Sequence, residues 1–129
     1  MQTGAMAVKI VIEGQGFHLE AELSNAKAAK RVAEALPLRA SMSRWGDEYY
    51  GRVNLQIPED PTGKEIIEVG EIAYCPPGKA LCIFFGPTPA SRDQRPRATS
   101  AVLPVGRVTA GLATLQGLGP SVRMSFREA

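Results

Sequence analysis

The sequence contains few of the residues from which enzymes build covalent or metal-dependent sites. Its 129 residues include one histidine, one tryptophan and two cysteines. Cys75 and Cys82 lack the C-x-x-C spacing of zinc or thioredoxin-type sites, and His18 has no second imidazole nearby in the sequence. No glycine-rich phosphate loop, serine-nucleophile motif or zinc-protease motif is present. We therefore expect no metal and no cofactor, and hydrolases and transferases are disfavoured.

The chain also has little excess of positive over negative charge. Lysine and arginine total 15 and aspartate and glutamate total 13, which gives a net charge of +2. The only basic cluster is Arg92, Arg95 and Arg97, which is interrupted by Asp93 and Pro96 and has no aromatic residue between its members. A nucleic-acid site usually needs a concentrated basic surface. We therefore interpret this cluster as a solvated loop and expect no nucleic-acid partner.

Long apolar runs are absent as well. No uninterrupted run reaches the roughly 18 residues that a membrane-spanning helix needs, so we expect no membrane partner. The first residues have neither the basic nor the apolar segment of a secretory signal. We expect one domain over residues 1–129, with a flexible start at residues 1–5, in the cytoplasm, where thiols stay reduced.

Alternation of apolar and polar residues dominates the rest of the chain. Two alternating segments, 7–13 and 17–23, flank Gly14-Gln15-Gly16, which predicts a β-hairpin. Further strands are predicted at 38–45, 52–57, 66–69, 72–75, 80–85, 102–108 and 122–127. Many short strands at this spacing favour a barrel or a sandwich, and a closed barrel leaves no strand edge unpaired.

Only one segment has clear helical periodicity. Ser24 or Asn25 is suited to the N-cap position, and Pro37 marks the exit. The apolar stripe between them is mostly alanine, so this helix can pack closely against a sheet but fills little core volume. Residues 112–116 are compatible with either a helical turn or a further strand.

The segment around Pro76–Lys79 predicts which side chains share a face. With a four-residue loop, Cys75 pairs with Ala80 and Ala73 with Cys82. The bulky set should fill the interior: Ile72, Tyr74, Leu81, Ile83 and Phe85. The other face carries the small side chains of Ala73, Cys75, Ala80 and Cys82 together with Phe84. It should form a shallow outer floor with one aromatic wall. In this register the two thiols are diagonal neighbours, so a disulfide is not expected.

Two segments combine aromatic residues with turns. Residues 44–50 hold the only tryptophan and two of the three tyrosines beside Gly46-Asp47. They are interpreted either as a turn with aromatic core residues or as a ligand surface. Residues 74–89 form either a stiff hairpin that prolines terminate or, at Gly86–Pro89, the rigid rim of a pocket.

Three motifs resemble a small prokaryotic family of cyclophilin-like domains. They are Arg44-Trp-Gly-Asp-Glu-Tyr49, the long segment Val69–Pro89, and Val105-Gly106. The resemblance covers nearly the whole chain. It implies a mainly β fold, namely a closed eight-stranded cyclophilin-like β-barrel with one main α-helix, in agreement with the strands inferred above.

The resemblance also implies site residues. Cyclophilins are peptidyl-prolyl cis–trans isomerases whose pocket lies on the outside of the barrel. By similarity, Phe84 matches the proline wall, Arg44 the donor, and Gln56 or Asn54 the amide. The cyclophilin histidine has no match, and Cys82 stands where a polar amide is expected. For a binding pocket we add Trp45, Tyr49, Cys82 and the rim residues Gly86, Pro87 and Thr88.

Two function hypotheses follow. The first is a binding module for a small molecule or an extended, proline-containing peptide, acting as a monomer or homodimer. The second is a weak peptidyl-prolyl isomerase. Rotation of an X–Pro bond faces a barrier of about 18–20 kcal/mol but breaks no covalent bond, so it needs no nucleophile.

Overall fold

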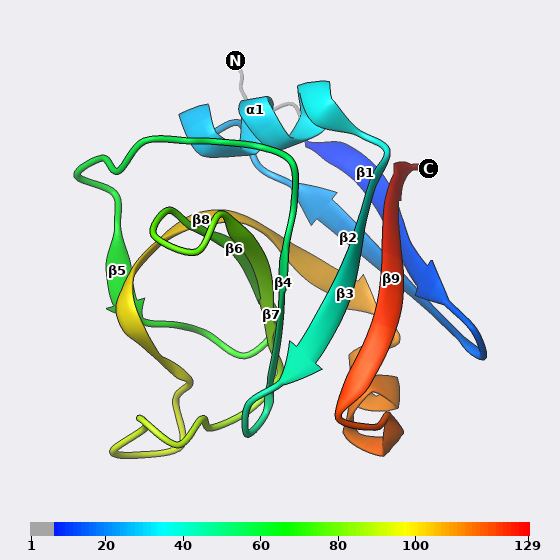
Figure 1. Ribbon diagram of the computed structural model, residues 1–129, viewed down its shortest axis with the longest axis vertical. Helices are drawn as coiled ribbons and strands as arrows, with labels where there is room; N and C mark the ends of the chain where they lie inside the picture. The colour runs from blue at the N-terminus through cyan, green and yellow to red at the C-terminus, as the bar shows by residue number, and fades with distance from the viewer. Residues whose placement is uncertain (1–6) are drawn as a thin grey trace.

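Eight strands hydrogen-bond in a closed ring in the computed structural model, which describes residues 7–129 (Figure 1). The order around the ring is β2-β1-β9-β3-β4-β7-β6-β8, and β8 pairs back to β2. Every neighbouring pair is antiparallel. The ring strands are β1 (Val8–Gly14), β2 (Phe17–Leu23), β3 (Leu38–Arg44), β4 (Glu48–Arg52), β6 (Glu71–Cys75), β7 (Ala80–Phe84), β8 (Arg97–Ala110) and β9 (Ser121–Glu128). The closed barrel expected from the sequence is confirmed.

Side-chain parity in the β6–β7 hairpin follows the predicted register. Cys75 lies opposite Ala80, and Ala73 opposite Cys82. The main core contains the bulky set from this hairpin: Ile72, Tyr74, Leu81, Ile83 and Phe85. The other face is also covered, because Ala73, Cys82 and Phe84 pack in a second apolar cluster outside the ring.

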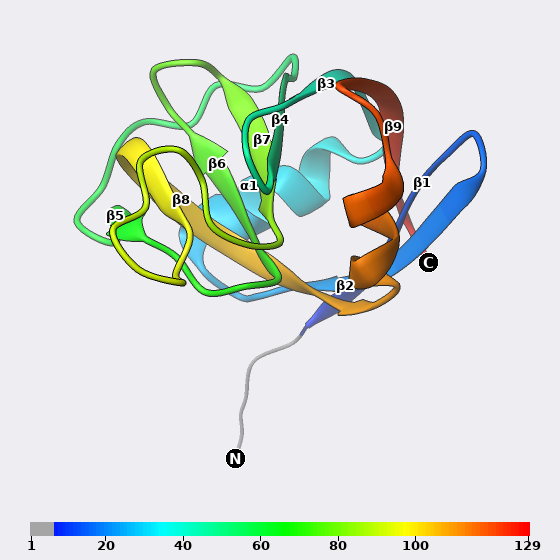
Figure 2. The same cartoon turned by 90° about the horizontal axis from the view of Figure 1, so that it is seen from below.

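The cover over this outer face is the first part of β8. This strand is far longer than the predicted 102–108 segment, because residues 97–100, expected in a solvated loop, already belong to it. The sequence did not predict this part of the strand, because most side chains of residues 97–100 are polar. These residues pair with β5 (Lys64–Ile66), a ninth strand that lies outside the ring (Figure 2). The predicted strand at 66–69 is wrong in position, because it shares only Ile66 with β5. Ala98 and Val102 close over the second cluster.

The predicted strand at 52–57 is wrong, since β4 ends at Arg52. The alternation of burial is nevertheless present, because Val53 and Ile57 are buried. The Tyr74 hydroxyl takes the place of a neighbouring strand: it accepts a hydrogen bond from the Ile57 amide at 3.2 Å and donates one to the Leu55 carbonyl at 2.6 Å. A side chain inside the barrel therefore satisfies this backbone.

Two short helices lie at opposite ends of the barrel (Figure 1). Helix α1 (Lys27–Ala35) buries Ala28, Ala29 and Val32. Its N-cap is Ala26 rather than Ser24 or Asn25, and no side chain caps it; the Ser24 hydroxyl instead accepts a hydrogen bond from the Ala26 amide. Residues 112–117 form a 3₁₀ helix, η1 (Leu112–Gly117).

Within residues 7–129, no helix is long and apolar enough to cross a membrane. The flexible start expected at residues 1–5 lies outside the described residues.

Candidate functional site

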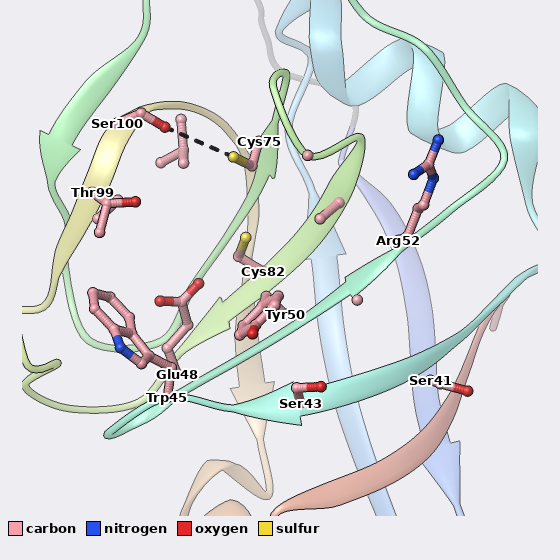
Figure 3. Close-up of a pocket in the computed structure, with 15 residues that line it drawn as sticks. Ser41, Ser43, Trp45, Glu48, Tyr50, Arg52, Cys75, Cys82, Thr99 and Ser100 are labelled. Carbon is pink, nitrogen blue, oxygen red and sulfur yellow. Dashed lines mark hydrogen bonds between the residues drawn. The ribbon is translucent and has the colours of Figure 1, made fainter.

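The outer wall of the barrel carries a pocket of about 510 Å³ (Figure 3). This volume lies within the range of small-molecule sites, roughly 300–1,000 Å³. One side is the covering segment of β8 and the floor is the outer face of the β6–β7 hairpin. The lining residues are Ser41, Ser43, Trp45, Glu48, Tyr50, Gly51, Arg52, Cys75, Gly78, Ala80, Cys82, Ala98, Thr99, Ser100 and Val102.

Glu48 is the acidic side chain in this pocket. It begins β4 immediately after a tight turn, in which the Trp45 and Glu48 backbones exchange hydrogen bonds. Strand parity then points Glu48 outward with Tyr50, and Figure 3 shows its carboxyl group between Trp45, Thr99 and Cys82. The residue is only 6 % exposed.

Burial without a cationic partner makes Glu48 an unusual carboxyl group. No ion pair to it is found within residues 7–129. Removal from water disfavours the charged form and raises its pKa to about 7, although a hydrogen bond from the Cys82 thiol opposes this shift. Near neutral pH, Glu48 can therefore exchange a proton or change its charge when a ligand binds.

The two cysteines are free thiols on the pocket floor. The Cys75 sulfur lies 3.9 Å from the Ser100 hydroxyl, which links the floor to the β8 side (Figure 3). Burial, together with the neighbouring Glu48 carboxylate, raises the pKa of the Cys82 thiol well above its usual value. A thiol that stays protonated is a poor nucleophile. Cys82 is thus poorly suited to act as a nucleophile. No three metal-ligating side chains gather within residues 7–129.

Arg44 lies on the opposite side of β3 from this pocket. It is paired with Tyr49, whose side chain faces the barrel interior, and its guanidinium carbon lies 5.0 Å from the centre of the Phe85 ring. The guanidinium donates hydrogen bonds to the carbonyls of Gly46, Leu115, Gln116 and Leu118 and contacts the Asp47 carboxylate at 3.1 Å. It therefore ties η1 to the turn before β4.

The predicted rim, Gly86–Pro89, braces the same turn. The Asp47 amide donates to the Pro87 carbonyl, and the Phe85 amide donates to the Asp47 carbonyl. A Cβ at Gly86 would lie 2.4 Å from the Asp47 carboxylate, so only glycine leaves room for it. Thr88 is buried and donates to the Arg97 carbonyl at the start of β8. These residues hold Trp45 and β8 in position without lining the pocket.

Of the site residues expected from the sequence, the structure places Trp45 and Cys82 in the pocket. Phe84 lies under the β8 cover with no exposed surface, so it forms no open wall. Asn54 and Gln56 are exposed in the segment after β4 and do not line the pocket.

Glu48 itself was not among the site residues expected from the sequence. The signal was the alternation of Glu48 with Tyr50 directly after the Gly46-Asp47 turn. It could be used only once β4 was known to pair with β7, which sets Tyr50 opposite Cys82.

We expect replacement of Glu48 by glutamine to change how stability depends on pH. The folded-state pKa of about 7 lies above the ordinary value of 4.5, so the wild type loses stability as pH rises through that interval. The glutamine side chain does not titrate. The advantage of Glu48→Gln over the wild type should therefore grow by about 2–3 kcal/mol between pH 4.5 and pH 8.

Urea unfolding at several pH values measures this difference. Glu59→Gln, a change at an exposed carboxylate, serves as the control and should show no comparable trend. A constant difference between Glu48→Gln and the wild type across the range would contradict the assigned pKa.

Comparison with known proteins agrees with this architecture. A hypothetical protein from Archaeoglobus fulgidus, known from a solution structure, superposes with a TM-score of 0.80 at 31 % sequence identity, and the similarity covers 100 % of both chains. No curated protein matches the sequence. The family model described as cyclophilin-like matches residues 6–124, and the chain therefore belongs to the cyclophilin-like family.

Proposed function

We propose that this cyclophilin-like domain is a binding module for a small molecule, which it holds in the pocket on the outer wall of the barrel. The observation that carries the proposal is Glu48, a side chain more than nine-tenths buried, without an ionic partner in the described chain, and directed into a cavity of about 510 Å³. A buried carboxyl group of this kind destabilises the fold unless something pairs with it. A ligand that supplies the missing partner accounts for its presence.

The pocket has the other features of a small-molecule site. Its floor is apolar and compact, formed by Ala80 and Cys82, and Val102 adds an apolar side chain from β8. Its rim carries the aromatic rings of Trp45 and Tyr50. The hydroxyl groups around it can orient a polar ligand. Its two free thiols suit a reducing compartment, which is the reason to place the protein in the cytoplasm.

The isomerase alternative lacks its expected donor in this pocket. The guanidinium of Arg44 is engaged with η1 and Asp47, and Phe84 is covered. An exchange assay on an X–Pro peptide tests the alternative directly, and we expect no acceleration of the cis–trans exchange.

Filling the pocket should abolish binding. Thr99 is exposed and faces the cavity, so Thr99→Phe can occupy the space without disturbing the core. A fragment library screened by thermal shift and by NMR should yield ligands that bind the wild type and lose at least about tenfold in affinity for Thr99→Phe.

Thr114→Phe makes the same chemical change on exposed η1, away from the pocket, and serves as the control. It should bind the same ligands as the wild type. Ligands that bind all three proteins equally would place the binding site elsewhere and contradict the proposal.

A further inference from the structure

We propose that the ligand carries a positively charged nitrogen group, an ammonium or an amidinium, that pairs with the Glu48 carboxylate. This inference rests on the proposed function, because it names the chemical class of the molecule that the pocket takes.

The titratable and charged side chains that line the pocket with Glu48 are Tyr50 and Arg52 on β4, Cys82 on β7, and Cys75 on β6. The pocket residues contributed by β3 are the serines at 41 and 43, and those contributed by the covering part of β8 carry no ionisable side chain. Neutral groups therefore make up most of the surroundings of the carboxylate.

The neighbouring charged side chains leave this carboxylate without a counter-charge. Arg52 lies four residues along the extended strand, about 13 Å from Glu48, and points away from it (Figure 3). Asp47 is held on the other side of the turn by Arg44 and by the Gln116 amide. Glu48 is consequently the dominant charge at its end of the pocket.

A cation beside Glu48 would offset the hydration energy that the carboxylate loses on burial, and a low-dielectric pocket strengthens the attraction between the two charges. The indole of Trp45 lies beside the carboxyl group in Figure 3, and an aromatic face attracts ammonium and guanidinium-type groups. The Ser43 and Thr99 hydroxyls can accept the remaining N–H bonds. A positive group beside Glu48 would gain both the ion pair and the contact with the Trp45 ring.

The competing chemistry is a neutral or anionic ligand that accepts a hydrogen bond from protonated Glu48. The two chemistries predict opposite pH dependences. A cation binds the ionised form, so its affinity rises as pH rises through the titration of Glu48, whereas an acceptor binds the protonated form and loses affinity over the same range. The sign of the slope therefore separates them.

The experiment uses two sets of probes with a common apolar body and different charges. They are benzamidine, benzamide and benzoate, and tryptamine, tryptophol and indole-3-acetate. Affinities are measured by NMR titration and calorimetry at pH 6, 7 and 8. We expect at least one cation to bind about tenfold more tightly than its neutral and anionic counterparts at pH 8, with an affinity about tenfold higher at pH 8 than at pH 6, since the ionised fraction of Glu48 rises by that factor.

Variants assign the effect to Glu48. Glu48→Gln should lose the preference for the cation and the slope with pH, while Thr114→Phe should keep both. The inference is overturned if a neutral or anionic probe binds most tightly, or if the affinity of a cation falls as pH rises. Either result would still support a small-molecule pocket. Failure of every probe and every fragment to bind overturns both. Cation binding that persists unchanged in Glu48→Gln also overturns the inference.

Discussion

Replacement of Arg44 by alanine should lower the free energy of unfolding by about 4 kcal/mol, because its charged donors satisfy several carbonyls that have no other protein donor within residues 7–129. The side chain is only 22 % exposed, and its guanidinium stacks on Phe85 as well as bonding η1. Alanine removes these donors and leaves the part-buried carbonyl of Leu118 without its partner. Equilibrium urea unfolding measures the loss.

The matched control lies on the same strand. Arg39 is exposed on β3 and has no side-chain hydrogen bond among those found for residues 7–129, so Arg39→Ala should change stability by no more than about 0.5 kcal/mol. Fragments found for the wild type should still bind Arg44→Ala under folding conditions. Equal stability of the two variants would contradict the structural role of Arg44. Loss of ligand binding in a folded Arg44→Ala variant would show that this arginine belongs to the binding site.

The side of the strand on which Arg44 lies could not be read from its motif alone. Alternation gives two faces but does not say which face is inside, and the turn at Gly46-Asp47 allows either assignment until β4 is paired. In the β6–β7 hairpin the assignment was possible, because the bulky set contrasts with an alanine and cysteine set. Residues 44–50 mix bulky and charged side chains on both faces, so size alone does not decide.

The pocket could not be predicted from local sequence patterns, because it is formed by segments that are far apart in the chain. Its floor, the Cys75, Ala80 and Cys82 face, follows from the predicted hairpin register. Its other side comes from residues 98–102, more than fifteen positions away, in a segment whose arginines and serines resembled a loop. Long-range pairing of β8 with β5 makes that segment a strand, and only this pairing turns an open floor into a cavity.

Barrel closure depends on Gly106, which stands out in the sequence only as part of the Val105-Gly106 motif. Gly106 lies at the seam where β8 pairs with Leu23 of β2 on one side and with Ile72 of β6 on the other. A Cβ at this position would lie 2.2 Å from the Glu22 carbonyl oxygen and 3.0 Å from the Leu23 Cα. Both are backbone atoms, which cannot move aside as the end of a long side chain can.

Gly106→Ala should therefore force β2 away from β8 and open the ring, with a loss of at least about 4 kcal/mol in the free energy of unfolding. Urea unfolding measures the loss, and hydrogen exchange should show the earliest loss of protection at the amides that join these two strands. Gly117→Ala adds the same methyl group where no atom lies within 4 Å, so its stability should stay close to that of the wild type. If Gly106→Ala were as stable as Gly117→Ala, the β2–β8 seam would not be the close contact that shuts the barrel, and the ring would have to tolerate a wider spacing at its point of closure.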